Sequence, residues 1–341
     1  MANRFLLDYD NPDAGIGHSM GVINRAIKIA DRNQLQFAYS ESQLAKSHKK
    51  SFKWNLRQRL RKLRGKRADE THDIGNALNE MLNPKALLPS REEVEKRIQR
   101  GEIRLIDLPA FEIHIPSNEQ DDEAIYQAVD QFIQNHPEPN TAFRIRANRF
   151  GDYEYASSRE WFLKAYAKAR ELFPIPLSFN PNELNIAIHI RRGDLLPGRQ
   201  FSDLSSRMLP DAWYLKILNV VAQNTNQKLA IYVFSEGKDG RYHSENGNPF
   251  SWKAHFEDTP YVVYEYIDSD FLSTFHHLLN ADVLIGSKSG MSHLAGMLGQ
   301  HIKIMPKMWH SYRGAIQLLE VSDQQNELHQ DQILRHLKQY L

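Results

Sequence analysis

Cysteine is absent from the 341-residue sequence. This absence excludes disulfide bonds, thiolate catalysis and zinc sites with cysteine ligands, and it fits a reducing compartment. Long apolar runs are also missing, since no segment approaches the roughly 18 apolar residues that a membrane-spanning helix needs. Near the start, only Phe5–Leu7 form an apolar run before charge returns, which predicts neither a signal peptide nor a membrane anchor. We therefore expect a cytoplasmic protein.

An excess of one charge is lacking as well. The chain has 43 Lys and Arg against 42 Asp and Glu, a formal net charge of +1, so nothing attracts it globally to nucleic acid. Residues 46–67 depart from this balance, with eleven Lys or Arg and no acid. Four apolar residues recur there about once per helical turn: Phe52, Leu56, Leu60 and Leu63. This spacing predicts a basic amphipathic helix.

Three roles remain open for the basic segment 46–67. It can be a solvated helix, which is the usual outcome for a run of charge. It can dock on an anionic lipid surface, giving a cytoplasmic protein with peripheral membrane association. A nucleic-acid site is disfavoured because only Phe52 and Trp54 are interleaved as aromatic residues.

Recognisable metal-ligand spacing is missing too. Neither His276-His277 nor His310 belongs to a His-Glu-x-x-His pattern. Asp268-Ser269-Asp270 leaves an Asp-x-Asp metal clamp as an alternative, but arginines elsewhere already supply positive charge. We expect no metal and no cofactor.

What the sequence does contain is an alternation of apolar strands and amphipathic helices. "RFLLDYD", a glycine-rich turn, a helix from Val22 and "LQFAYS" follow one another as in a βαβ unit. Further on, "NIAIHI", "KLAIYVFSE", "YVVYEYI", "ADVLIG" and "HIKIMP" are apolar almost throughout, as expected for parallel strands covered on both faces. Residues 174–185 carry three prolines and predict a linker. We predict two α/β domains, 1–175 with a basic helical insertion at about 46–100 and 185–341, facing each other across a cleft.

The first candidate site follows the strand "NIAIHI". Ligands of open α/β sheets bind beyond the carboxyl ends of the strands, where His189, Arg191, Arg192, Gly193 and Asp194 lie. Arginine forks match phosphate oxygens, and Gly193 permits a turn and a close backbone approach. Strand alternation sends the two arginines to opposite sides unless the chain turns. Asp194 can hold a guanidinium or bind a sugar hydroxyl, and a surface Arg–Asp pair that merely caps the strand is the alternative.

The second candidate site is "ADVLIGSKSGMSHLAGMLG". Ser287, Ser289 and Ser292 surround the start of a predicted helix, whose free N–H groups and dipole favour a phosphate. Simple helix capping by serine is the alternative. Asp282 is expected to order the strand edge or a base-binding loop, and His293 to pack in the core. With the arginines, this stretch predicts a two-walled cradle for a diphosphate.

The third candidate is "DAGIGHSMG", near the N-terminus. Gly15 and Gly17, with Gly21, predict a strand-to-helix turn at which an acceptor or a sugar can approach the backbone closely. The Gly-x-Gly spacing alone is weak evidence for a dinucleotide site, and no acid closes the next strand to hold a ribose. His18 or Asp13 can act as the general base for an acceptor hydroxyl, and purely local hydrogen bonding is the alternative.

These motifs carry a resemblance to a known superfamily. "HIRRGD" resembles the His-x-Arg-Arg-x-Asp motif of α1,2- and α1,6-fucosyltransferases and is similar to the shorter motif of protein O-fucosyltransferases. "ADVLIGSKSGMSHLA" and "GIGHSMG" resemble a later and an earlier motif of the same superfamily, and the three occur in its order. "GHSMG" departs from the superfamily's acidic or asparagine-containing versions, and residues 46–100 have no recognised counterpart.

The resemblance implies a GT-B architecture of two Rossmann-like domains and inverting, metal-independent transfer of fucose from GDP-fucose. By that analogy Arg191 and Arg192 bind the diphosphate and stabilise departing GDP, His189 and Asp194 hold guanine or ribose, and the serines bind phosphate or sugar. The acceptor hydroxyl can belong to a glycan, a lipid-linked oligosaccharide or a protein, and Asp194 is a further candidate for the base. Two alternatives remain: another nucleotide sugar as donor, or a non-catalytic module that binds polyanions or membrane surfaces through residues 46–67.

Overall fold

A computed structural model describes residues 3–7, 16–39, 74–109, 119–145, 152–198, 202–237 and 240–341. The basic segment 46–67, Asp13 and Gly15 lie outside these ranges. The chain divides into two compact units, one comprising Met1–Tyr153 and Glu160–Pro174 and the other Glu154–Arg159 and Ile175–Leu341. Among the helices in the described ranges, none has both the length and the apolar character that a bilayer crossing requires.

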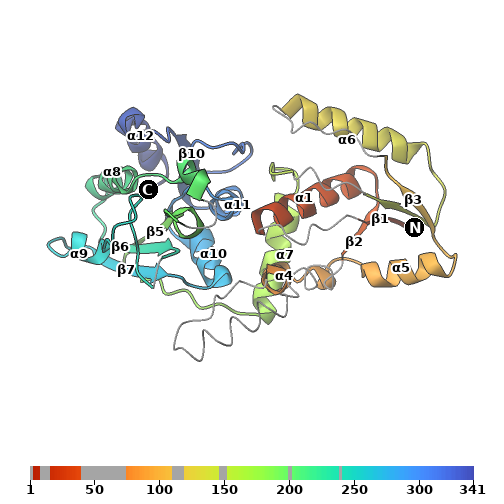
Figure 1. The fold of residues 1–341 in the computed structure, drawn as a ribbon, viewed down its shortest axis with the longest axis horizontal. Helices are drawn as coiled ribbons and strands as arrows, with labels where there is room; N and C mark the ends of the chain where they lie inside the picture. Colours follow the sequence, from red (N-terminus) through yellow and green to blue (C-terminus); the bar gives the residue numbers. More distant parts are fainter. Residues whose placement is uncertain are drawn as a thin grey trace. The chain divides into compact units, whose positions relative to one another are not determined.

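The first unit is built on a parallel sheet with the strand order β2-β1-β4-β3. Its strands are β1 (Arg4–Leu7), β2 (Gln36–Ala38), β3 (Arg104–Asp107) and β4 (Thr141–Arg144). Its helices are α1 (Ile16–Arg32), α4 (Ile74–Leu82), α5 (Arg91–Gln99), α6 (Glu119–Gln134) and α7 (Arg159–Leu172), with a 3-10 turn at Pro84–Ala86. Helices therefore alternate with the strands, as the apolar periodicity predicted (Figure 1).

Apolar side chains hold these elements together. Phe5 and Leu7 of β1 share a core with Val94 of α5, so every second residue of the strand meets this helix. Helix α1 contacts α6, where Arg32 is ion-paired with Glu123. Covering helices of this kind explain why the central strands β1 and β4 are largely buried although they are short.

The second unit carries a six-stranded parallel sheet. Its strands are β5 (Leu184–Ile190), β6 (Leu229–Ser235), β7 (Val262–Ile267), β8 (Val283–Ile285), β9 (Ile302–Pro306) and β10 (Leu318–Val321). Its helices are α8 (Asp211–Gln223), α9 (Trp252–His255), α10 (Phe271–Asn280), α11 (Gly290–Leu298) and α12 (Gln330–Tyr340), with 3-10 turns at Gly193–Leu195, Ser202–Arg207 and Gln325–Glu327. The strand order β7-β6-β5-β8-β9-β10 is that of a doubly wound Rossmann sheet.

Strand β5 is buried at all seven positions, because helices cover both faces of the sheet. Ile188 and Ile190 belong to one core cluster with Trp213 of α8 and Leu337 of α12. His189, between them in the strand, points to the other face and meets Ser292 of α11. Alternation along this one strand therefore decides which residues reach which helix layer.

The predicted α/β class with two Rossmann-like parallel sheets is confirmed. Two details differ from the sequence analysis. The edge strand β10 and helix α12 were not predicted. The proposed linker 174–185 runs into β5 at its end, and two of its N–H groups make hydrogen bonds to the second unit: Asn180 to the Tyr232 hydroxyl at 3.1 Å and Ser178 to His277 Nε2 at 3.0 Å.

Candidate functional site

The strand order of the second unit reverses beside β5. From β5 the chain proceeds through β6 and β7 on one side, then returns to add β8, β9 and β10 on the other. Strands β5 and β8 are parallel neighbours, with Ile188 opposite Ile285. In open α/β sheets the connections diverge at such a point and leave a crevice beyond the strand ends, where ligands bind. Two of the predicted motifs follow these two strands.

A buried hydrogen-bond network joins the two motifs. His189 Nδ1 lies 2.6 Å from Ser292 Oγ and 3.1 Å from Ser287 Oγ, and the Ser287 N–H donates to Ser292 Oγ at 3.1 Å. Burial, and then the nearby positive charge of Arg191, lowers the pKa of His189 to about 3. The imidazole is therefore neutral, and its observed contacts position the start of α11 against the end of β5.

The serines of the second motif are less exposed than the sequence alone predicts. Ser287, Ser289 and Ser292 are all buried. Ser289 is the N-cap of α11, where its hydroxyl accepts from the Met291 N–H at 3.2 Å, so the capping alternative describes its observed contact. Half-buried Lys288 and Gly290 form the more exposed part of this helix start. The N–H groups of Ser287, Ser289 and Met291 already make internal hydrogen bonds, so an anion here would meet the remaining N–H groups of the first turn before the serine hydroxyls.

Arg191 is the arginine that faces solvent. Its side chain is 22% exposed and donates from Nη2 to Asp194 Oδ2 at 2.9 Å. Asp194 is itself 34% exposed, so the pair is open on one side. Gly193 between them has φ +31°, and a Cβ there would lie 2.5 Å from Glu236 Oε2. The glycine is thus required both for the turn and for the close approach of the β6 end.

Arg192 occupies the opposite face, which corrects the prediction of two arginines on one diphosphate. Its side chain is fully buried, and Nη2 donates to Asp211 Oδ1 at 2.6 Å. Tyr242 also donates to Asp211. Strand alternation explains this outcome, because Arg192 follows the direction of Ile190 into the α8 layer. An internal carboxylate neutralises its charge, so we assign Arg192 a positioning role rather than direct diphosphate binding.

Glu236 joins this strand-end cluster, although the sequence analysis did not single it out. It directly follows β6, and its backbone carbonyl accepts from the Gly193 N–H at 3.4 Å. The residue as a whole is solvent-exposed. Desolvation by nearby protein atoms, and then the negative charge of Asp194, nevertheless raises the pKa of Glu236 to about 7. No motif marks it, since its importance comes from the neighbouring strand.

Asp282 lies at the wrong edge of the sheet to join the other predicted ligands. It precedes β8, and its Oδ2 accepts from the Asn185 N–H at 2.8 Å and from Asn185 Nδ2 at 3.0 Å. These contacts tie together the amino ends of β5 and β8. Asp282 therefore orders the strand edge, which is one of the two roles expected from the sequence, and it lies at the end of β8 opposite to the serines.

The glycine-rich stretch of the first unit forms helix rather than a turn at its described positions. Gly17 and Gly21 both lie within α1, and the His18 side chain, like Asp13 and Gly15, is outside what the structure describes. A Cβ at Gly21 would lie 2.8 Å from the Tyr153 ring, and the Gly21 carbonyl accepts from the Asp152 N–H at 3.0 Å. This glycine thus admits an internal segment to the helix surface. The roles of the other four residues as base and acceptor-binding groups stay predictions.

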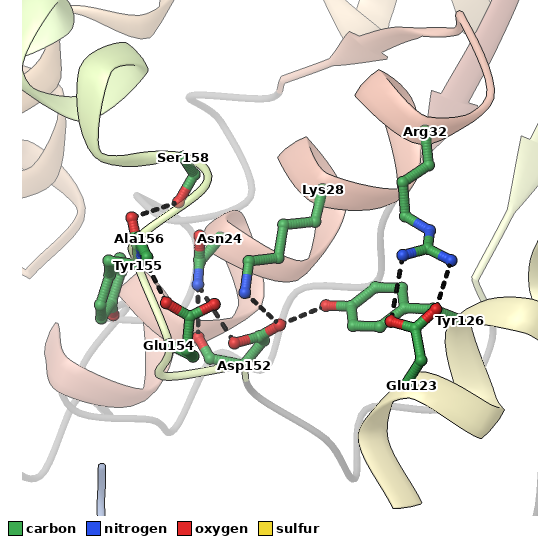
Figure 2. Close-up of polar contacts among 10 residues, drawn as sticks. All are labelled: Asn24, Lys28, Arg32, Glu123, Tyr126, Asp152, Glu154, Tyr155, Ala156 and Ser158. Atoms are coloured by element: carbon green, nitrogen blue, oxygen red, sulfur yellow. Dashed lines mark hydrogen bonds and ion pairs between the residues drawn. The ribbon is translucent and has the colours of Figure 1, made fainter. Parts of the chain in front are cut away.

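A buried carboxylate fastens that internal segment to α1. Asp152 Oδ2 is 2.8 Å from Lys28 Nζ and also accepts from the Tyr126 hydroxyl, while Asn24 Nδ2 donates to the Asp152 carbonyl at 2.9 Å (Figure 2). Beyond it, Glu154 accepts from the Ala156 N–H at 2.5 Å. Because donors from both α1 and α6 bind the Asp152 carboxylate, we assign this residue a structural role.

The residues with metal-ligand chemistry have other observed contacts. Asp270 caps α10 by accepting from the Ser273 N–H at 2.8 Å, and Asp268 accepts from the Gly237 N–H at 2.8 Å. His277 packs among aromatic rings that include Phe234. Within the part of the chain that the structure describes, no three His, Asp or Glu side chains are grouped to hold a metal ion.

Comparison with known proteins finds similarity at the level of coordinates alone. No protein-family model matches the sequence, and no curated protein matches it. E. coli heptosyltransferase WaaC with ADP matches with 11% identity and a TM-score of 0.40, covering 98% of this chain and 99% of that chain. POFUT1 in complex with GDP-fucose matches with 10% identity and a TM-score of 0.46, covering 88% of this chain and 96% of that chain.

A third solved structure is UDP-GlcNAc 2-epimerase from Neisseria meningitidis bound to UDP-GlcNAc. It matches with 9% identity and a TM-score of 0.32, covering 98% of this chain and 90% of that chain. With identities this low, the function of this protein has to be argued from its own site.

Proposed function

We propose that this protein is a glycosyltransferase that takes its sugar from a nucleotide-sugar donor bound by the second unit. The observation that carries the proposal is the convergence of Arg191 and the start of α11 at the reversal of the strand order. Ligands of doubly wound sheets bind at this place. A cation and a helix N-terminus together favour a doubly charged phosphate ligand.

The contacts of Arg191 support a role in binding rather than in folding alone. Its partner Asp194 is one-third exposed, and a diphosphate can take over the outward N–H groups of the guanidinium without burying a charge. Arg192, by contrast, has no exposed surface and is bound to Asp211. It fixes the turn from which Arg191 projects, because its Nη1 donates to the Arg191 carbonyl at 3.1 Å.

The chemistry of transfer matches this arrangement. The acceptor hydroxyl oxygen attacks the anomeric carbon, a base takes the hydroxyl proton, and the bond between that carbon and the phosphate oxygen breaks with its electron pair going to the nucleoside diphosphate. Negative charge therefore grows on the β-phosphate. In this proposal Arg191 and N–H groups at the start of α11 stabilise that charge, and one such donor is worth on the order of 3 kcal/mol.

Within this class we propose inverting transfer of fucose from GDP-fucose without a metal ion. Support comes from the "HIRRGD" motif and its resemblance to fucosyltransferases. His18, Asp13 or Asp194 is the proposed base, and a glycan, a lipid-linked oligosaccharide or a protein supplies the hydroxyl. We expect EDTA to leave donor hydrolysis unchanged, because Arg191 supplies the countercharge. Loss of activity on chelation, with recovery on adding a divalent cation, would contradict metal-independent transfer.

Calorimetric titration with GDP tests the donor site. We expect Arg191→Ala to weaken GDP binding about 10- to 100-fold, because hydrogen bonds to charged groups contribute about 1.5–3 kcal/mol each. Arg335→Ala is the matched control, since Arg335 is exposed on α12. Equal affinity of wild type and Arg191→Ala for GDP would remove Arg191 from the site. Release of nucleotide from GDP-fucose, GDP-mannose, UDP-GlcNAc and an ADP-sugar then identifies the donor.

A further inference from the structure

Trp309 is the half-exposed tryptophan of the second unit. Its side chain is 50% exposed, whereas Trp213 and Trp252 are completely buried. It lies on the loop after β9, three residues past Pro306, at the carboxyl end of a strand that is paired with β8. It therefore belongs to the same edge of the sheet as the start of α11.

The indole is held in place despite its exposure. The guanidinium of Arg207 lies over one face, 4.5 Å from the ring centroid, and the indole N–H donates to His310 Nε2 at 2.9 Å. Both contacts limit rotation of the side chain, so the face opposite Arg207 is presented without a large entropy cost on binding.

The loop that carries Trp309 is attached to the candidate site. His310 packs against His293, with ring centroids 5.2 Å apart, and His293 sits in the first turn of α11. His293 Nε2 lies 2.8 Å from the Ser311 carbonyl oxygen, and Tyr312 packs on the same imidazole. Trp309 is therefore linked to the start of α11 through His310 and His293, close to any ligand that binds there.

The positive charge of Arg207 determines which kind of aromatic ligand can stack on Trp309. With a guanidinium on one face, the other face attracts C–H groups and cations less, and an electron-rich aromatic ring more. Burial, and then the nearby His293 and Arg207, lowers the pKa of His310 to about 3, so this neighbour is neutral and Arg207 supplies the local positive charge. A purine that carries phosphate groups satisfies both the stacking face and the charge.

We propose that Trp309 stacks on the purine base of a nucleotide whose diphosphate binds at Arg191 and the start of α11. This inference rests on the proposed function and adds the base-binding side of the same site. Trp309 thereby determines that the donor is a nucleotide and not merely a phosphate, while Arg207 and His310 position the ring.

Titrations of GDP and inorganic pyrophosphate against Trp309 variants test this proposal. Stacking of one base on an aromatic side chain is worth about 1–3 kcal/mol, so Trp309→Ala should weaken GDP binding about 5- to 100-fold and leave pyrophosphate within about twofold. Trp309→Phe should restore most of the GDP affinity. Tyr340→Ala, which removes an exposed aromatic ring of α12, is the control and should change neither affinity. GDP should also quench the tryptophan fluorescence of wild type and not that of Trp309→Phe.

The outcomes separate this inference from the proposed function. GDP binding that depends on Arg191 but is unchanged in Trp309→Ala would overturn the stacking role and leave the donor site intact. Equal weakening of GDP and pyrophosphate by Trp309→Ala would show that the loop merely supports α11, which also overturns it. If wild type binds neither GDP nor pyrophosphate, the proposed function and this inference both fail.

Discussion

His189 Nδ1 on β5 lies 2.6 Å from Ser292 Oγ on α11, and this contact spans the point at which the strand order reverses. The two residues are more than a hundred positions apart in sequence, and both are buried. Their bond determines where the start of α11 sits relative to Arg191, so it can be tested through both stability and binding.

We expect Ser292→Ala to destabilise the protein and to weaken GDP binding. The substitution removes the hydroxyl that bonds both His189 Nδ1 and the Ser287 N–H, and an unsatisfied buried group costs about 1–3 kcal/mol. Urea unfolding measures the first effect and calorimetry the second. Unchanged GDP affinity in a clearly destabilised Ser292→Ala protein would show that the network serves folding only.

Glu236 predicts a pH dependence of donor binding. Because the pKa of Glu236 is raised to about 7, its carboxyl loses a proton as the pH rises through neutrality. The new charge faces Asp194, Asp268 and Arg191, and it opposes a phosphate ligand at Arg191 by about 1 kcal/mol at contact distances in water. Wild type should therefore bind GDP about threefold to tenfold less tightly at pH 8 than at pH 6, relative to Glu236→Gln, which carries no such charge. Since GDP titrates identically in both experiments, an equal pH profile for the two proteins would refute a role for Glu236.

Replacing Arg192 should destabilise the protein by breaking its buried ion pair with Asp211. Arg192→Met leaves the Asp211 carboxylate without its guanidinium, and an orphaned partner of a buried ion pair costs about 3–5 kcal/mol. The double variant Arg192→Met, Asp211→Leu removes both charges and should recover much of this free energy of unfolding. Chemical denaturation measures both variants. A double variant no more stable than the single one would mean that the pair is not the reason for Arg192's burial.

The lowered pKa of Lys303 predicts that its contribution to the free energy of unfolding rises at alkaline pH. Its Nζ is buried and donates to the Gly299 carbonyl at 2.7 Å, while burial, and then the charge of Arg159, lowers its pKa from 10.5 to about 7. Between pH 7 and 10.5 the unfolded chain therefore holds a proton that the folded protein has released. The contribution of Lys303 to the free energy of unfolding grows with pH across that window and is lost as pH falls toward 7.

Unfolding of wild type and Lys303→Met by urea at pH 7.5 and 9.5 isolates this contribution. The stability difference between the two proteins should shift toward wild type at the higher pH. A difference that does not change with pH would mean that Lys303 titrates normally in the folded state.

Much of the fold could be predicted from the chain because local patterns determine it. Apolar runs such as "NIAIHI" and "KLAIYVFSE" are long enough to be strands covered on both faces, and both are strands in the structure. The edge strand β10 escaped prediction, since it has only four residues, of which Glu320 is exposed and Val321 alone is fully buried. Short edge strands depend on a neighbour for their hydrogen bonds, and their own sequence says little of it.

In the candidate site, too, some features follow from local sequence and others depend on neighbours in the fold. Neighbours along the chain were enough to predict that His189 lies near the end of a buried strand, that Arg191 and Asp194 follow this strand, and that Ser289 begins a helix. The packing of separate strands was needed to show that Asp211 neutralises Arg192, that Asp282 lies at the opposite edge, and that Glu236 and Trp309 join the carboxyl edge of the sheet. Charge, burial and pKa are set by groups that come together from separate strands, and spacing along the chain does not record which strands become neighbours.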